Sequence, residues 1–130
     1  MRVLVVDDES IVLDSCKKVL AMEGIDVVLS ASADQALTAL GKETFSLILV
    51  DFKMPRKDGL SFMKDVKEKW PEVPIIVMSG YATPETIDEV SKTGAAKFIA
   101  KPFTPDELIE AIRQVMEKED IHGEKEDSRH

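Results

Sequence analysis

The chain has 130 residues, 44% of them hydrophobic and 32% charged, which is the composition of one ordinary globular domain. No apolar run approaches the roughly 20 residues needed to cross a bilayer, and the start lacks the pattern of a secretory signal, so we expect a cytoplasmic location and no membrane partner. The net charge of -8 argues against direct nucleic-acid binding, because phosphate recognition needs clustered Lys and Arg.

Five apolar segments alternate with five amphipathic ones, the pattern of repeated strand–helix units in a parallel sheet. The strands are expected at residues 2–6, 26–30, 46–50, 74–79 and 96–100. The first, third and fourth are apolar throughout, as expected when helices cover both faces of a sheet. The second is polar at its ends, which favours an edge position.

Helix boundaries are marked by capping residues and glycines. Ser32 with Gln35 and Thr104 with Glu107 are capping-box pairs, and the further markers are Thr83 before Pro84, Pro105, Gly24, Gly59 and Gly94. Cys16, the one cysteine, falls on the apolar stripe of the first helix and is interpreted as a buried hydrophobe.

The last helix is predicted over residues 105–119, and residues 120–130 have little left to bury. We therefore divide the chain into a domain at 1–119 and a charged, disordered tail at 120–130, which is either the start of a linker or a solvated end. His122 and His130 are the only histidines. The predicted domain thus has no histidine for general-base chemistry or zinc binding.

Five such units favour a doubly wound, flavodoxin-like α/β sheet with strand order 2-1-3-4-5. Ligands of this architecture bind beyond the carboxyl ends of strands 1 and 3, where Asp7, Asp8 and Asp51 follow the strands. Three carboxylates in one crevice suit a hard divalent cation, and Mg²⁺ is the expected occupant. The alternative is that Asp7 and Asp8 only cap a helix starting near Ser10.

Two more polar residues end strands on the same side of the sheet. Ser79 ends strand 4 and precedes Gly80, and Lys101 follows strand 5 and precedes Pro102. Taken singly, these are ordinary turn and surface residues. Beside an acidic crevice, a hydroxyl and an ammonium at the rim are groups that phosphoryl oxygens would need.

The chain resembles the receiver domain of two-component response regulators over about residues 2–118. The resemblance depends on four motifs in order: Asp7-Asp8, the stretch DFKMPRKDG at 51–59, Ser79-Gly80-Tyr81-Ala82 and Lys101-Pro102-Phe103. It implies a phosphoacceptor, Asp51, that takes a phosphoryl group from a phosphohistidine of a sensor histidine kinase or a histidine phosphotransfer protein. The domain would catalyse only its own phosphorylation and dephosphorylation.

The resemblance also assigns roles around Asp51. Mg²⁺ would be held by Asp8, Asp51 and the carbonyl of Lys53, with Asp7 acting mostly through water, while Lys101 and Ser79 would bind phosphoryl oxygens. On phosphorylation Ser79 would move and an aromatic residue of strand 5, here Phe98, would turn inward; Phe98 could equally be plain core. The family often has tyrosine at that position.

Further expectations from the resemblance concern loops and surfaces. The Lys101-Pro102 bond is expected to be cis, Pro55 and Gly59 to shape the loop after Asp51, and Lys53 and Tyr81 to set the lifetime of the acyl phosphate by shading it from water. Helix 4, strand 5 and helix 5 would form the partner or homodimer face. Its candidate contacts, which could also be core, are Phe98, Phe103 and Ile109.

The downstream partner would be a separate protein or a fused output domain, since the chain reads either as a stand-alone regulator or as the receiver of a longer one. Two other functions fit the topology less well. An aspartate-nucleophile phosphohydrolase would need a second aspartate where Lys53 stands. A flavin carrier would need a Gly- and hydroxyl-rich loop after strand 1, where the sequence is DDES.

Overall fold

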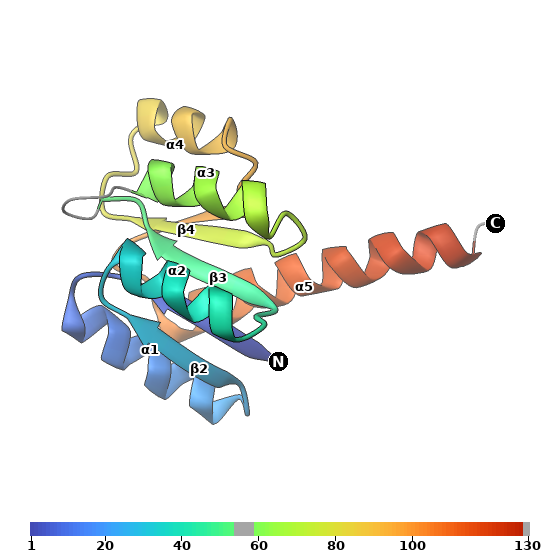
Figure 1. Cartoon of the computed structure of the whole chain (residues 1–130), viewed down its shortest axis with the longest axis horizontal. Helices are drawn as coiled ribbons and strands as arrows, with labels where there is room; N and C mark the ends of the chain where they lie inside the picture. Colours follow the sequence, from blue (N-terminus) through green and yellow to red (C-terminus); the bar gives the residue numbers. More distant parts are fainter. Residues whose placement is uncertain (54–58, 129–130) are drawn as a thin grey trace.

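Strands and helices alternate along the whole of the computed structural model, which describes residues 1–53 and 59–128 (Figure 1). The expected loop residue Pro55 lies outside the described residues. The elements are β1 (Arg2–Val6), α1 (Ser10–Met22), β2 (Asp26–Ser30), α2 (Ala33–Lys42), β3 (Leu47–Asp51), α3 (Gly59–Lys69), β4 (Ile75–Ser79), α4 (Pro84–Ser91), β5 (Lys97–Ala100) and α5 (Pro105–Ser128).

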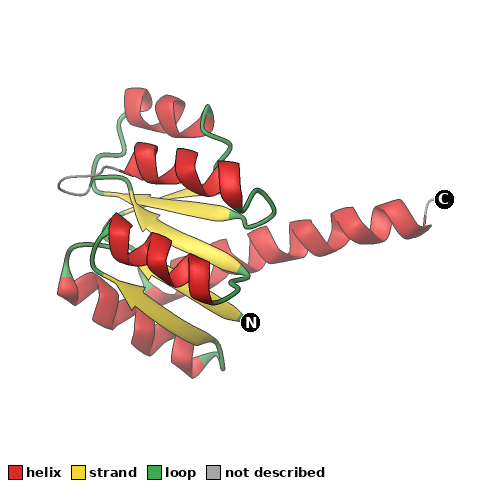
Figure 2. Cartoon of the chain, viewed as in Figure 1, coloured by secondary structure: helices red, strands yellow, loops and turns green. Residues whose placement is uncertain are grey.

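All five strands form one parallel sheet in the order β2-β1-β3-β4-β5, which confirms the predicted fold class and the edge position of β2 (Figure 2). Val6 pairs with Val50 across β1 and β3, and Asp51 pairs with Met78 across β3 and β4. The carboxyl ends of the three central strands therefore lie at the same edge of the sheet, at the topological switch point.

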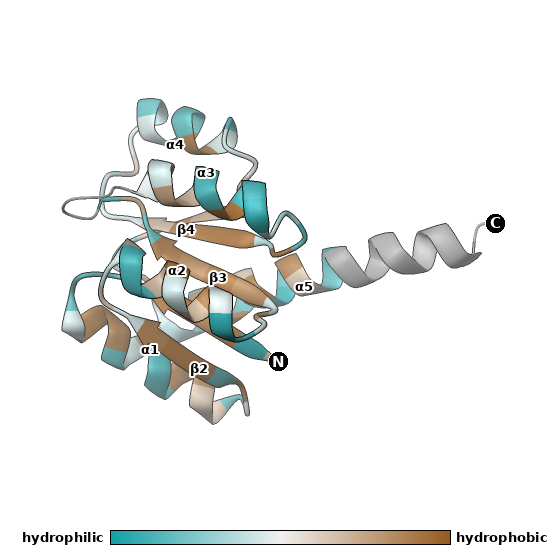
Figure 3. Ribbon diagram, in the orientation of Figure 1, coloured by the Kyte–Doolittle hydropathy of each residue, from teal (hydrophilic) through white to brown (hydrophobic). Residues whose placement is uncertain are grey.

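Helices cover both faces of the sheet, so the apolar strands are buried on each side (Figure 3). Successive residues of β3 alternate between two clusters: Ile48 and Val50 pack with α2, α3 and α4, while Leu47 and Leu49 pack with α1 and α5. All four side chains are fully buried. At roughly 1.5–3 kcal/mol for each large apolar side chain, this double burial fixes the strand rigidly beneath the residue that ends it.

The predicted caps are present, one of them in altered form. Thr104 N–H donates to Glu107 Oε1 and Glu107 N–H to Thr104 Oγ1, a complete capping box before α5. Ser32 accepts from the amide of Gln35, but the Gln35 side chain accepts from Ala31 N–H rather than from Ser32 N–H. The starts of α2 and α5 are both fixed by side-chain hydrogen bonds.

Three strands begin one residue later than predicted, β3 at Leu47, β4 at Ile75 and β5 at Lys97, and two elements end elsewhere than expected. β3 runs one residue further than predicted and includes Asp51, because Asp51 is still paired with the neighbouring strand β4. The last helix does not end near Glu119 but continues to Ser128, since Glu and Lys have good intrinsic helix propensity. The division of the chain at residue 119 remains a prediction.

Within the described ranges, no helix has both the length and the hydrophobicity that a membrane crossing requires.

Candidate functional site

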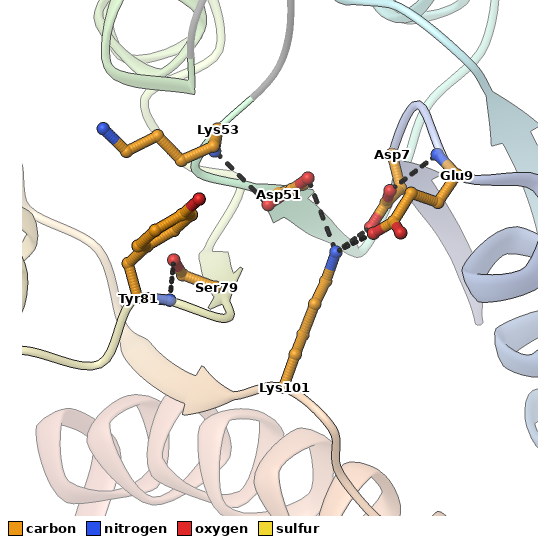
Figure 4. A network of polar contacts seen from close by, with 7 residues as sticks. All are labelled: Asp7, Glu9, Asp51, Lys53, Ser79, Tyr81 and Lys101. Atoms are coloured by element: carbon orange, nitrogen blue, oxygen red, sulfur yellow. Dashed lines mark hydrogen bonds and ion pairs between the residues drawn. The ribbon is translucent and has the colours of Figure 1, made fainter.

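Lys101 is the centre of the polar network at the carboxyl edge of the sheet (Figure 4). Its ammonium Nζ lies 2.7 Å from Asp7 Oδ2, 3.1 Å from Glu9 Oε1 and 3.4 Å from Asp51 Oδ2. The backbone fixes its origin, because Lys101 N–H donates to the carbonyl of Ser79 at 2.8 Å. The end of β5 therefore places a cation among carboxylates that follow β1 and end β3.

Asp7 and Asp51 are both buried, with 0% and 5% of their surface exposed. Burial, followed by the charge of Asp7, raises the pKa of Asp51 from 3.8 to about 6, against the lowering effect of Lys101. Burial also raises the pKa of Asp7, and the ion pair with Lys101 offsets part of that rise. Burial alone would lower the pKa of Lys101, but its carboxylate partners together raise it.

The acidic group has the chemistry of a divalent cation site. Asp7, Asp8 and Asp51 each offer a carboxylate oxygen, and these oxygens lie within 4.8 Å of one another. Asp7 Oδ2 is fully buried and accepts no hydrogen bond from the residues described, its near neighbour being the Lys101 ammonium. Excess negative charge and unsatisfied oxygen acceptors are what a hard cation such as Mg²⁺ would satisfy, so the residues present fit this ion.

Asp8 is exposed, unlike the other two carboxylates. It lines a hollow of about 710 Å³ together with Asp51, Lys53, Tyr81 and Lys101. The hollow gives solvent access to Asp51, whose own surface is nearly all covered. A small anionic group thus has a route to the buried carboxylate.

The loop before α1 does not use its aspartates as helix caps. Asp7 Oδ1 accepts from Glu9 N–H at 2.9 Å, one residue before the helix begins at Ser10. The N-cap residue is Glu9, and its side chain makes no capping bond. The helix-cap interpretation of Asp7 and Asp8 is therefore not supported, and Glu9 joins the site although the sequence patterns did not single it out.

Ser79 is the last residue of β4, as predicted. Its side chain is fully buried, and its Oγ accepts from Tyr81 N–H at 3.0 Å. The hydroxyl therefore belongs to the turn after β4 in this conformation. Because the oxygen acts as the acceptor in this bond, the O–H of Ser79 is still a donor.

Lys53 and Tyr81 line the same hollow, and each follows the carboxyl end of one of the neighbouring strands β3 and β4 (Figure 4). Lys53 N–H donates to Asp51 Oδ1 at 3.3 Å. The Lys53 ammonium lies 5.7 Å from the centre of the Tyr81 ring and 5.8 Å from that of Phe52, within the range of cation–π attraction. The two long side chains predicted to shade Asp51 are thus held near each other.

Gly59 holds the start of α3 against the end of β3. Its N–H donates to the carbonyl of Phe52 at 2.9 Å, and a Cβ at this position would stand 2.8 Å from Phe52 Cα and 2.9 Å from the carbonyl oxygen of Asp51. Only a residue without a side chain allows so close an approach. Gly59 was predicted to shape the loop after Asp51, and the structure shows it as the first residue of α3, in contact with the end of β3.

The remaining predicted residues lie on β5, in the segment after it and on α5. Phe98 is partly buried and packs against the cluster under α2, α3 and α4; Phe103 and Ile109 are partly buried against the opposite cluster. The Lys101-Pro102 bond is cis, as expected. The three apolar side chains therefore belong at least partly to the core, and their proposed partner contacts stay a prediction.

Comparison with known proteins gives a consistent result. The profile of the response regulator receiver domain matches residues 3–113. The hydrogenase transcriptional regulatory protein HoxA of Cupriavidus necator is 41% identical over 123 residues, covering 94% of this chain and 25% of HoxA. The transcriptional regulatory protein DltR of Streptococcus agalactiae is 37% identical over 115 residues, covering 87% of this chain and 50% of DltR.

Solved structures agree with these sequence matches. NtrX from Brucella abortus superimposes with a TM-score of 0.91 at 33% identity, covering 98% of this chain and 29% of that protein. A CheY-like receiver domain protein from Methanospirillum hungatei has a TM-score of 0.84 at 34% identity, covering 92% of this chain and 96% of the other. The chain spans a quarter to a half of the curated relatives described above. With the acidic pair, the strand-end aspartate and the lysine on one sheet edge, the chain belongs to the response regulator receiver domain family of two-component systems.

Proposed function

We propose that Asp51 is a phosphoacceptor that takes a phosphoryl group from a phosphohistidine on a sensor histidine kinase or a histidine phosphotransfer protein. A carboxylate oxygen of Asp51 forms the new bond to phosphorus, the P–N bond breaks, and its electron pair returns to the imidazole. The observation that carries this proposal is the placement of Asp51: a buried carboxylate at the end of a rigid central strand, 3.4 Å from Lys101 and facing a hollow open to solvent.

The neighbouring residues would stabilise the charge that develops on the phosphoryl oxygens. Lys101 would bond one oxygen through its ammonium, and Ser79 would donate its O–H to another. Asp8, Asp51 and the carbonyl of Lys53 would hold Mg²⁺, with Asp7 acting mostly through water. The ion would supply positive charge between the anionic nucleophile and the anionic phosphoryl group.

The signal would leave the domain through its α4–β5–α5 face. Phe98 would turn further inward as Ser79 moves, and the face would then bind a downstream protein, a fused output domain or a second copy of the chain. The supporting feature is that Phe98 sits on β5, three residues before Lys101. The domain would act in the cytoplasm without contacting nucleic acid or membrane, and would catalyse only its own phosphorylation and dephosphorylation.

Intact-mass analysis tests the central claim. The full chain is incubated with Mg²⁺ and acetyl phosphate, alongside Asp51→Asn and a control, Asp14→Asn, which removes an exposed aspartate of α1. Wild type and the control should gain the mass of one phosphoryl group, and Asp51→Asn should gain none. No gain on wild type, or an equal gain on Asp51→Asn, would show that Asp51 is not the acceptor.

A further inference from the structure

Glu9 occupies the N-cap position of α1 without acting as a side-chain cap. Its carbonyl accepts from Val12 N–H at 3.1 Å and from Leu13 N–H at 3.2 Å, but its carboxylate bonds no helix amide. Ser, Thr, Asp and Asn are the residues that usually serve this position. The Glu9 side chain instead lies with Oε1 at 3.1 Å from Lys101 Nζ, so its partner is the lysine.

Three carboxylates surround the ammonium of Lys101, which donates a hydrogen bond to Glu9 and forms ion pairs with Asp7 and Asp51. A lysine ammonium has three donors and no acceptor, and Asp7, Glu9 and Asp51 all lie within ion-pair distance of Nζ. Figure 4 shows the dashed contacts converging on this one atom. A phosphoryl oxygen that approaches the ammonium would compete with these carboxylates, and with Glu9 for the N–H that it already accepts.

Glu9 is the partner that can leave at least cost. The Asp7 side chain is fully buried, and its other oxygen is fixed by Glu9 N–H. Asp51 is the proposed acceptor, so it stays beside the phosphoryl group. The Glu9 side chain is 63% exposed, and an exposed carboxylate that turns into water regains its hydration.

We propose that Glu9 is a positioning residue that holds, in the unphosphorylated protein, the Lys101 donor that a phosphoryl oxygen takes over, and that it thereby restrains the phosphorylation of Asp51. This inference rests on the proposed function. Because exposed ion pairs are weak, removing this one should speed acyl-phosphate formation by about two- to fivefold. The effect should depend on the length of the Glu9 side chain as well as on its charge.

Variants of Glu9 separate a direct contact from general repulsion. Glu9→Gln removes the charge, and Glu9→Asp keeps the charge but shortens the side chain by one methylene. Both should react faster than wild type with Mg²⁺ and acetyl phosphate, as measured by initial rates of mass gain on the full chain. Glu23→Gln, the same change on an exposed residue at the far end of α1, should react at the wild-type rate.

A second measurement places the effect on Lys101. In a Lys101→Met background, which should itself react slowly, adding Glu9→Gln should give no further increase. The inference would be overturned if both Glu9 variants, or Glu9→Asp alone, reacted at the wild-type rate. It would also be overturned if Glu9→Gln gave an undiminished increase in the Lys101→Met background. Each of these results would leave the phosphoacceptor proposal standing. Absence of any mass gain on wild type would overturn both.

Discussion

Asp51 is expected to lower the stability of the metal-free protein, so replacing it by Asn should raise the free energy of unfolding. The carboxylate is nearly buried beside the charge of Asp7, and these two causes raise its pKa to about 6. Asparagine has almost the same shape and can still accept the amide bond from Lys53. The substitution therefore removes a charge while leaving the packing in place.

The pKa gives both the size and the sign of the effect. Moving the pKa of Asp51 from 3.8 to about 6 corresponds to about 3 kcal/mol between its charged and neutral forms. The fold favours the protonated form, so this contribution is fully present below about pH 4 and is lost as pH rises through about 6. Because the pKa already includes the attraction of Lys101, Asp51→Asn should gain about 2–3 kcal/mol near pH 7.

Urea unfolding in a metal chelator at several pH values measures this gain. The difference between Asp51→Asn and wild type should be near zero at about pH 4 and should grow to its full value by about pH 7. Asp14→Asn, with the same change of net charge on an exposed helix position, should differ by less than about 0.5 kcal/mol. A destabilised Asp51→Asn, or a gain independent of pH, would show that burial of this charge does not strain the fold.

Three further outcomes are expected. Gly59→Ala should destabilise the domain by about 1–3 kcal/mol in urea unfolding, because its Cβ would meet the Phe52 backbone. The control Gly41→Ala, whose Cβ would meet no neighbouring atom in its helix, should be neutral or stabilising. Equal effects of the two substitutions would contradict the close-approach argument. Burial raises the pKa of the Cys16 thiol from 9.0 to about 11, so the native thiol should resist alkylation at about pH 8 and should react after unfolding. Ionisation of the thiol in the unfolded state should lower the free energy of unfolding by up to about 3 kcal/mol between about pH 9 and 11, and Cys16→Ala should not show this loss. A Lys53→Ala, Tyr81→Ala double variant should release phosphate faster than wild type when the decay of the phosphorylated mass is followed, and an unchanged decay would remove both side chains from the control of lifetime.

The sheet and the residues at its edge could be predicted because each depends on short-range pattern and general topology rules. Apolar runs such as that ending at Val50 show burial on both faces, and the right-handed crossover rule leaves few strand orders. Once β1 and β3 are neighbours, Asp7 and Asp51 must share an edge. Their nearness follows from chain connectivity, without knowledge of any side-chain conformation.

Side-chain conformations could not be predicted in this way. Glu9 was missed because a glutamate before a helix is unremarkable in sequence, and only the structure shows it turned toward Lys101. Ser79 was expected at the rim, but the polar pattern did not show that its hydroxyl is bonded by the amide of Tyr81. The extension of α5 to Ser128 was missed because the apolar periodicity used to end the helix reports burial, whereas helix formation there needs only local propensity.

Strand β5 is bonded to the sheet on one side only, through β4. It nevertheless touches both layers of the molecule, because Phe98 packs beneath α2, α3 and α4 while Ile99 packs with α1 and α5. Lys101 follows directly at its end. Because β5 pairs only with β4, a displacement of β5 would leave the pairing among the three central strands unbroken while changing the packing of both helix layers.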